Sequence, residues 1–198
     1  MELLKLFNED QVYEVLLVTR SNVTPVGVVR RGERLSFKLF GGKSAEEIKG
    51  HPKASIQVTN DVELMVKLAL NFETWLEFEE HGDYRWVKNL PGVYGEVEFR
   101  EEHHEDELGS ATILKCILFP EGEIEGTLPP RPISRADNYL LEMGVNLTRL
   151  LVAVKNGKDK VAKALYEQLV WDYKMYKKFG GGSEIAEKML NLALDTFG

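Results

Sequence analysis

The chain of 198 residues is short of cysteine, of basic charge and of long hydrophobic runs, and each shortage excludes a class of protein. Its one cysteine, Cys116, cannot form a disulfide within the chain, which excludes a disulfide framework and favours a reducing cytoplasm. The 32 acidic residues outnumber the 25 basic ones and give a net charge of −7, which argues against a surface built to bind nucleic acid. No apolar run approaches the roughly 20 residues of a membrane span, and the first residues lack the basic start of an export signal. We therefore expect a cytoplasmic protein without nucleic-acid or membrane partners.

What is present is typical of a globular fold rich in strands. Hydrophobic residues make up 43% of the chain and charged residues 29%. Short β-rich runs with turn signals between them predict strands, and two helices interrupt these strands. The predicted strands cover residues 12–19, 24–30, 35–40, 54–58, 75–79, 85–87, 93–100 and 111–119, the helices cover 45–49 and 62–70, and a charged loop covers 101–107. This spacing predicts a closed or half-closed barrel.

The composition changes after residue 127. A proline-rich segment, 129–132, predicts a stiff linker, and the periodicity beyond it is helical. Ser134 is a candidate cap for the first of three helices, the second covers 159–179, and Ser183 is a candidate cap for the third. We therefore expect a β-rich α+β protein in which residues 1–128 form the barrel domain and residues 129–198 a C-terminal three-helix unit packed on the barrel.

A glycine-rich segment follows the third predicted strand: Gly41, Gly42, Lys43 and Ser44. It is not a Walker loop, since that motif requires glycine at position 37, where phenylalanine stands. One interpretation is an anion site, because glycines let the backbone approach a phosphate, Lys43 adds charge and a helix begins here. The other interpretation is a loop whose glycines only allow a positive φ.

Three further patterns each leave two interpretations open. Gly27 lies inside a strand, which indicates either close approach of a flat ligand or a barrel corner. Arg135, Glu142 and Arg149 share a helix face opposite the apolar stripe, with Asn138 and Asn146 between them; this face is either solvated or carries an arginine for a ligand anion. His103 and His104 stand among acidic residues, where a solvated loop is favoured over a metal site. We expect Cys116 to be an inert buried thiol, and the three tryptophans, Trp75, Trp86 and Trp171, to lie in the core.

Several of these segments together resemble one family, the flavin-binding split-barrel proteins grouped as domain of unknown function 447, which are flavin reductase-like. In the first part of the chain the resemblance runs through residues 24–28 (Thr-Pro-Val-Gly-Val), 39–42 (Leu-Phe-Gly-Gly) and 58–61 (Val-Thr-Asn-Asp). Later it runs through residues 134–136 (Ser-Arg-Ala), Glu142, Val145 and 148–150 (Thr-Arg-Leu).

The resemblance implies a six-stranded split barrel that forms a homodimer and holds FMN at the subunit interface. It implies that Pro25, Val26 and Gly27 line the flavin ring. It also implies that Gly42, Lys43 and Ser44 meet the phosphate, and that Ala45 and Ile48 stand where the family has threonine and asparagine. It further implies that Asn60 lies near the phosphate. The remaining matched positions are Phe40, Arg135 and Arg149, and the resemblance assigns no role to the two arginines.

The function expected from the resemblance is that of an FMN-dependent oxidoreductase with a small-molecule electron donor or acceptor. No catalytic residue and no metal ligand is assigned. Two alternatives stay open. One is a non-enzymatic carrier or sensor of flavin or another anionic ligand, and the other is a structural homodimer with a decayed site.

Overall fold

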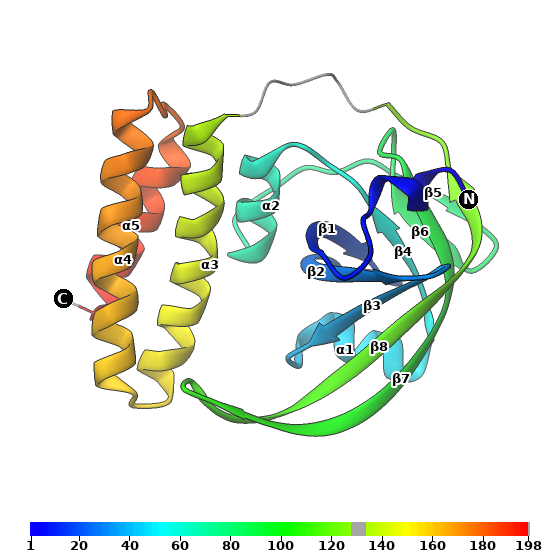
Figure 1. Ribbon diagram of the computed structural model, residues 1–198, viewed down its shortest axis with the longest axis horizontal. Helices are drawn as coiled ribbons and strands as arrows, with labels where there is room; N and C mark the ends of the chain where they lie inside the picture. The colour runs from blue at the N-terminus through cyan, green and yellow to red at the C-terminus, as the bar shows by residue number, and fades with distance from the viewer. Residues whose placement is uncertain (128–133, 198) are drawn as a thin grey trace. The chain divides into compact units, whose positions relative to one another are not determined.

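Six strands close into a barrel in the computed structural model, which describes residues 1–127 and 134–197 (Figure 1). The order around the barrel is β1-β2-β3-β8-β7-β4. β1 pairs antiparallel with β2 and β4, β3 with β2 and β8, and β4 with β7. This confirms the predicted β-rich α+β fold with a barrel. The barrel strands are β1 (Val12–Val18), β2 (Val23–Arg31), β3 (Arg34–Leu39), β4 (Lys53–Gln57), β7 (Gly92–Asp106) and β8 (Gly109–Ile124).

The barrel belongs to the first of two compact units, which consists of residues 1–60, 75–104 and 111–127. Alternate residues of its strands face an apolar core, as the period of two requires. Leu35, Phe37 and Leu39 of β3 are all buried there, and Ser36 and Lys38 between them are not. The same unit contains the 3-10 helix η1 (Leu3–Leu6), helix α1 (Gly42–Gly50), and a separate two-stranded sheet of β5 (Phe78–His81) and β6 (Tyr84–Val87).

Helices form the core of the second unit, which consists of residues 61–74, 105–110 and 134–197. Helix α3 buries the predicted stripe of Leu140, Met143, Leu147 and Leu150. The unit contains α2 (Val62–Ala69), α3 (Arg135–Lys155), α4 (Asp159–Lys178) and α5 (Glu184–Phe197). In the part of the chain that the structure describes, no helix is both long and apolar enough to cross a membrane. The proline linker and the expected domain boundary after residue 128 lie outside the described residues.

The charged segment 101–107 corrects one prediction, because it is not a loop. β7 continues through it to Asp106 and pairs with β8. A strand tolerates this many charges where they face outward and have partners of opposite sign. Glu101 pairs with Lys49, and Glu102 pairs with Arg100. His103 and His104 are therefore strand residues, and no group of three or more potential metal ligands is found among the described residues.

Two of the tryptophans were also wrongly predicted to lie in the core. Trp75 is 91% exposed, in the connection between α2 and β5, and Trp171 is 54% exposed on α4. Only Trp86 is partly buried, and its ring stacks on Tyr94 at a centroid distance of 5.6 Å. Trp75 and Trp171 therefore contribute little to the core.

Candidate functional site

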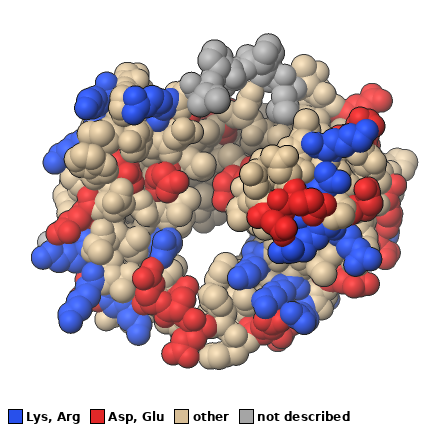
Figure 2. Space-filling view, in the orientation of Figure 1, with Lys and Arg blue, Asp and Glu red and all other residues tan. Residues whose placement is uncertain are grey.

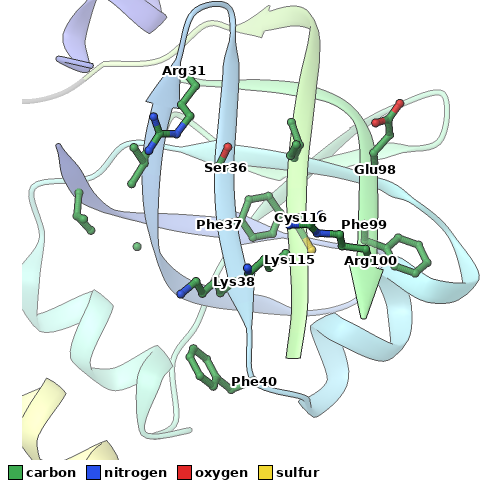
Figure 3. A pocket seen from close by; sticks show the side chains of 14 residues that line it. Arg31, Ser36, Phe37, Lys38, Phe40, Glu98, Phe99, Arg100, Lys115 and Cys116 are labelled. Atoms are coloured by element: carbon green, nitrogen blue, oxygen red, sulfur yellow. The ribbon is translucent and has the colours of Figure 1, made fainter. Parts of the chain in front are cut away.

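A cavity of about 860 Å³ lies against the outer wall of the barrel (Figure 3). Most of its lining residues alternate along their strands with core residues, so their side chains point away from the barrel interior. Phe37 and Cys116 are core residues that form its floor. The lining is Val12, Gly27, Val29, Arg31, Ser36, Phe37, Lys38, Phe40, Glu98, Phe99, Arg100, Lys115, Cys116 and Ile117.

Part of this wall is apolar although it faces outward. Val12 is 67% exposed, Phe40 is 63% exposed and Phe99 is 38% exposed, and all three line the cavity. The Phe40 ring meets the His104 ring edge to face at 5.5 Å. Exposed apolar side chains gathered at a concave surface indicate a site for a ligand or for another chain.

Basic side chains line the same cavity. Arg31 pairs with Asp10 at 2.5 Å, and Arg100 pairs with Glu102 at 2.7 Å. Figure 2 shows basic side chains gathered over the barrel on this face, with acidic side chains beside them. In a chain of net charge −7, such a concentration of cations marks an anion-binding surface. The basic residues of the lining are Arg31, Lys38, Arg100 and Lys115, and its one acidic residue is Glu98.

The β2 segment with the predicted ring contacts has a bare stretch of backbone. Gly27 lines the cavity, Pro25 is partly buried, and Val26 turns into the core with 7% exposure. β2 pairs with β3 over residues 28–31 and with β1 over residues 23–29, so its first half is paired with β1. This is where a strand tolerates proline. A Cβ on Gly27 would come within 3.1 Å of Val12 Cγ1, so glycine keeps this backbone open to the cavity.

The diglycine bend follows Phe40 directly and leads into α1. Gly41 and Gly42 have φ values of 86° and 79°, a region that glycine adopts without strain. No side chain caps the amino terminus of α1, and its first turn contains no acidic residue. The exposed N–H groups and dipole at such an end favour an anion. Lys43 is exposed beside them.

The predicted phosphate contact Ser44 is placed differently from Lys43. Its side chain is buried, with 3% exposure, and its Oγ accepts a hydrogen bond from Asn22 Nδ2 at 2.9 Å. One turn later, Glu47 accepts hydrogen bonds from Thr19 Oγ1 at 2.6 Å and from Ser21 N at 3.0 Å. Burial raises the pKa of Glu47, but the hydrogen bonds from Ser21 and Thr19 outweigh it and hold the pKa below its ordinary value. These contacts fix α1 on the turn between β1 and β2.

Two departures from the family pattern have a structural explanation. Ala45 is 3% exposed and Ile48 is fully buried, and both pack in the barrel core. Side chains at these positions of α1 point away from the solvent side of the helix. Their change to apolar residues therefore leaves the exposed end of α1, at Gly42 and Lys43, unaltered.

The thiol of Cys116 is a buried core group, as predicted. It is 1% exposed, and burial raises its pKa to about 12. The thiolate is the reactive form of cysteine, so this side chain is not a nucleophile at neutral pH.

Asn60, Arg135 and Arg149 are not among the residues that line the cavity. Asn60 follows β4 at the end of a segment of the first unit. Arg135 and Arg149 belong to the second unit. The Arg135 guanidinium lies over the Phe179 ring at 3.9 Å, and Arg149 pairs with Glu107. Of the ten predicted residues, the structure brings Gly27 and Phe40 together in the cavity.

The helix face that carries these arginines is not uniformly polar and solvated. Asn146 is 8% exposed, and its Nδ2 donates to Asp172 Oδ2 of α4 at 2.8 Å. Gln168 Nε2 donates to the other carboxylate oxygen at 2.8 Å. Burial raises the pKa of Asp172, and the two amide donors offset part of this shift. The asparagine therefore belongs to a helix contact and not to a ligand face.

The basic lining residues were missed in the sequence because they lie on four different strand segments. A signal was present for two of them. Lys38 alternates with apolar residues in a predicted strand, and Lys115 is the one charged residue in the apolar run 113–119, so both indicate outward side chains. Nothing local to either strand indicates that the two meet. Such partners are far apart in sequence, so the site cannot be recognised from the sequence alone.

Residues 13–124 match the family model described as "Protein of unknown function (DUF447) N-terminal domain". The crystal structure of an FMN-bound protein from Methanosarcina mazei, assigned to the same DUF447 family, superimposes with a TM-score of 0.66, 22% sequence identity and coverage of 96% of each chain. This likeness shows that the two proteins share a fold.

A second solved structure is far less similar. The flavin reductase of styrene monooxygenase from Pseudomonas putida S12 gives a TM-score of 0.35 and 12% identity, over 62% of this chain and 93% of that one. No curated protein matches the chain.

Proposed function

The chain belongs to the DUF447 family, and we propose that it is an FMN-binding flavoprotein that transfers electrons as a cytoplasmic homodimer. The observation that carries the proposal is the cavity, which is lined by the open backbone of Gly27, the exposed ring of Phe40 and four basic side chains. The family member from Methanosarcina mazei, which shares the fold, is FMN-bound.

The residues present fit this cofactor. A flat apolar ring can lie against backbone that carries no side chain, and Gly27 supplies such backbone. A Cβ at this position would contact Val12. A phosphate needs N–H donors and positive charge, which the uncapped end of α1 and Lys43 supply. In this proposal Pro25 and Gly27 border the ring, while Gly42 and Lys43 hold the phosphate. Ser44 does not contact the phosphate through its side chain in this proposal. Its hydrogen bond with Asn22 holds the first turn of α1 in position.

FMN, when bound, supplies the transfer of one or two electrons, and the protein supplies its position and electrostatics. The residues of the cavity would orient the ring and exclude water from one of its faces. Cys116 is not assigned a chemical role, since its thiol stays protonated in the core. The exposed side chains Val12, Phe40 and Phe99 give this wall the apolar character of a subunit contact, which supports the homodimer.

The first test is the absorbance spectrum and mass of the small molecule that co-purifies with the full chain. A yellow protein that releases FMN supports the proposal, and reduction of its colour by a nicotinamide cofactor would favour an oxidoreductase over a carrier or sensor. A colourless protein that takes up no FMN, yet is dimeric by analytical ultracentrifugation, would favour the structural homodimer.

The second test concerns the phosphate end. Lys43→Glu should weaken FMN binding at least tenfold, which corresponds to about 1.4 kcal/mol. Lys163→Glu is the control for the change of charge, because Lys163 is exposed on α4 of the second unit. Equal FMN affinities for Lys43→Glu and wild type would remove the end of α1 from the site.

A further inference from the structure

Two lysines lie directly opposite each other on the cavity wall. Lys38 of β3 and Lys115 of β8 are Cα partners in the antiparallel register, and both line the cavity. Figure 3 shows the two side chains next to each other, with Phe40 beyond them. Like charges at directly opposed positions of a sheet destabilise it. Such a pair is therefore costly to the fold unless an anion compensates it.

The compensation within the protein is incomplete. Glu102 pairs with Lys115 and also with Arg100, the third cation at this point. A hydrogen bond from Lys115 lowers the pKa of Glu102, and the charges of Arg100, Lys115 and Lys38 lower it further. Lys38 itself has no carboxylate within salt-bridge distance in the described part of the chain. One carboxylate thus faces three cations, an excess of two positive charges.

The other acidic residue of the lining does not remove this excess. Glu98 lies two residues before Arg100 on β7, and Figure 3 shows its side chain pointing away from Lys38 and Lys115. Arg31 is already paired with Asp10. The local charge of the wall around the two lysines therefore stays positive.

We infer that Lys38, Lys115 and Arg100 form a second anion site in the cavity, which receives a phosphate group of the electron donor or acceptor. The inference rests on the proposed function, in which the FMN phosphate is held at the other place, the amino end of α1. An excess of two charges suits a doubly charged phosphate, and lysine ammonium groups bind phosphate as point charges. The cosubstrate class is accordingly a small phosphorylated molecule.

The experiment is a calorimetric titration of the FMN-loaded full chain with inorganic pyrophosphate, at an ionic strength held constant with sodium chloride. The variant carries Lys38→Gln together with Lys115→Gln, and Lys5→Gln is the control, since Lys5 is exposed and paired with Glu2 at 2.5 Å. We expect the wild type and the control to bind pyrophosphate equally. We expect the double variant to bind it at least tenfold more weakly, with its FMN affinity unchanged within about twofold.

Several results would overturn the inference. One is the absence of pyrophosphate binding to FMN-loaded wild type, and another is tighter binding of malonate, a dicarboxylate, than of pyrophosphate. A third is a double variant that loses affinity for FMN but keeps its affinity for riboflavin, since the cluster would then hold the cofactor's own phosphate.

Two alternative measurements apply if the variant does not fold or if the wild type does not bind FMN. If the double variant does not fold, Lys38→Gln alone is used, because that side chain is exposed and without a carboxylate partner among the described residues. If the wild type takes up no FMN, the proposed function fails. The same titration of the flavin-free chain then decides whether the three cations bind a phosphate, and a negative result there overturns the anion site as well.

Discussion

Asn22 Nδ2 donates a hydrogen bond to Ser44 Oγ at 2.9 Å and so joins the turn between β1 and β2 to the first turn of α1. Glu47 makes the second attachment through Thr19 and Ser21. Thr19 and Ser44 are both almost fully buried. The position of the diglycine bend therefore depends on polar contacts from a turn 20 residues earlier in the chain.

Glu47→Gln should weaken this attachment and lower the free energy of unfolding by about 1–3 kcal/mol, because an amide cannot accept all the hydrogen bonds that the carboxylate accepts. Glu46→Gln is the matched control: Glu46 is exposed on the same helix, and its effect should stay within about 0.5 kcal/mol. Urea unfolding measures both.

The change at Glu47 also removes a negative charge near α1, which by electrostatics alone would tighten FMN binding. Weaker FMN binding in this variant would show that position outweighs charge.

The pH dependence of stability should contain a contribution from Glu47. Its pKa in the folded state is lowered below the ordinary value of 4.5. The stability that this carboxylate contributes is then fully present above about pH 4.5 and is lost as the pH falls through the folded-state pKa. The free energy of unfolding, measured from pH 7 to pH 3, should become equal for wild type and Glu47→Gln at the acidic end of this range. Parallel curves would exclude this linkage.

The contribution of Asp172 to the pH dependence of stability should have the opposite sign. Burial raises its pKa, so its contribution is fully present below the unfolded pKa and is lost as the pH rises through the folded-state pKa. Asp172→Asn keeps an acceptor for Asn146 and removes the buried charge, and the amide of the exposed Gln168 can turn over to accept from the new Nδ2. The variant should therefore be at least as stable as wild type at pH 7. Asp172→Ala leaves two amides without their acceptor and should cost about 1–3 kcal/mol. Thermal unfolding of Asp172→Asn and Asp172→Ala tests this prediction. Equal losses of stability in the two variants would contradict it.

Gly27→Val should preserve the fold and weaken FMN binding by at least tenfold, since its side chain would project where the ring is proposed to lie. Gly50→Ala is the control, because a Cβ there meets nothing within 4 Å. Fluorescence titration with FMN and with riboflavin measures the effect. Both ligands should lose affinity equally at Gly27, whereas Lys43→Glu should affect FMN alone.

The barrel and the helices could be predicted because their signals are local. The alternation of Leu35, Phe37 and Leu39 with polar residues determines which side of β3 faces the core, and the stripe from Leu140 to Leu150 does the same for α3. Segment 101–107 was mispredicted for the same reason. Its charges read locally as a loop, and the lysines that neutralise Glu101 and Glu102 lie on other elements.

The candidate site could be predicted only in part. Gly27 and Phe40 carry a local signal, and the structure places both in the cavity. The opposition of Lys38 and Lys115 joins strands 77 residues apart in sequence, so it follows only from the register of the closed barrel. Neither interpretation of the helix face between Arg135 and Arg149 included the helix contact of Asn146, because its partner Asp172 lies on another helix.

The two units interleave along the chain, and this has a consequence for dissection of the protein. Val66 of α2 packs in the same apolar cluster as the C-terminal helices, although it precedes the barrel strands β7 and β8 in sequence. The Leu108 carbonyl likewise accepts a hydrogen bond from Asn156 of that unit. A proteolytic fragment that starts at residue 134 would leave part of its own interior behind. Such a fragment is expected to denature more readily than the same helices in the uncut polypeptide.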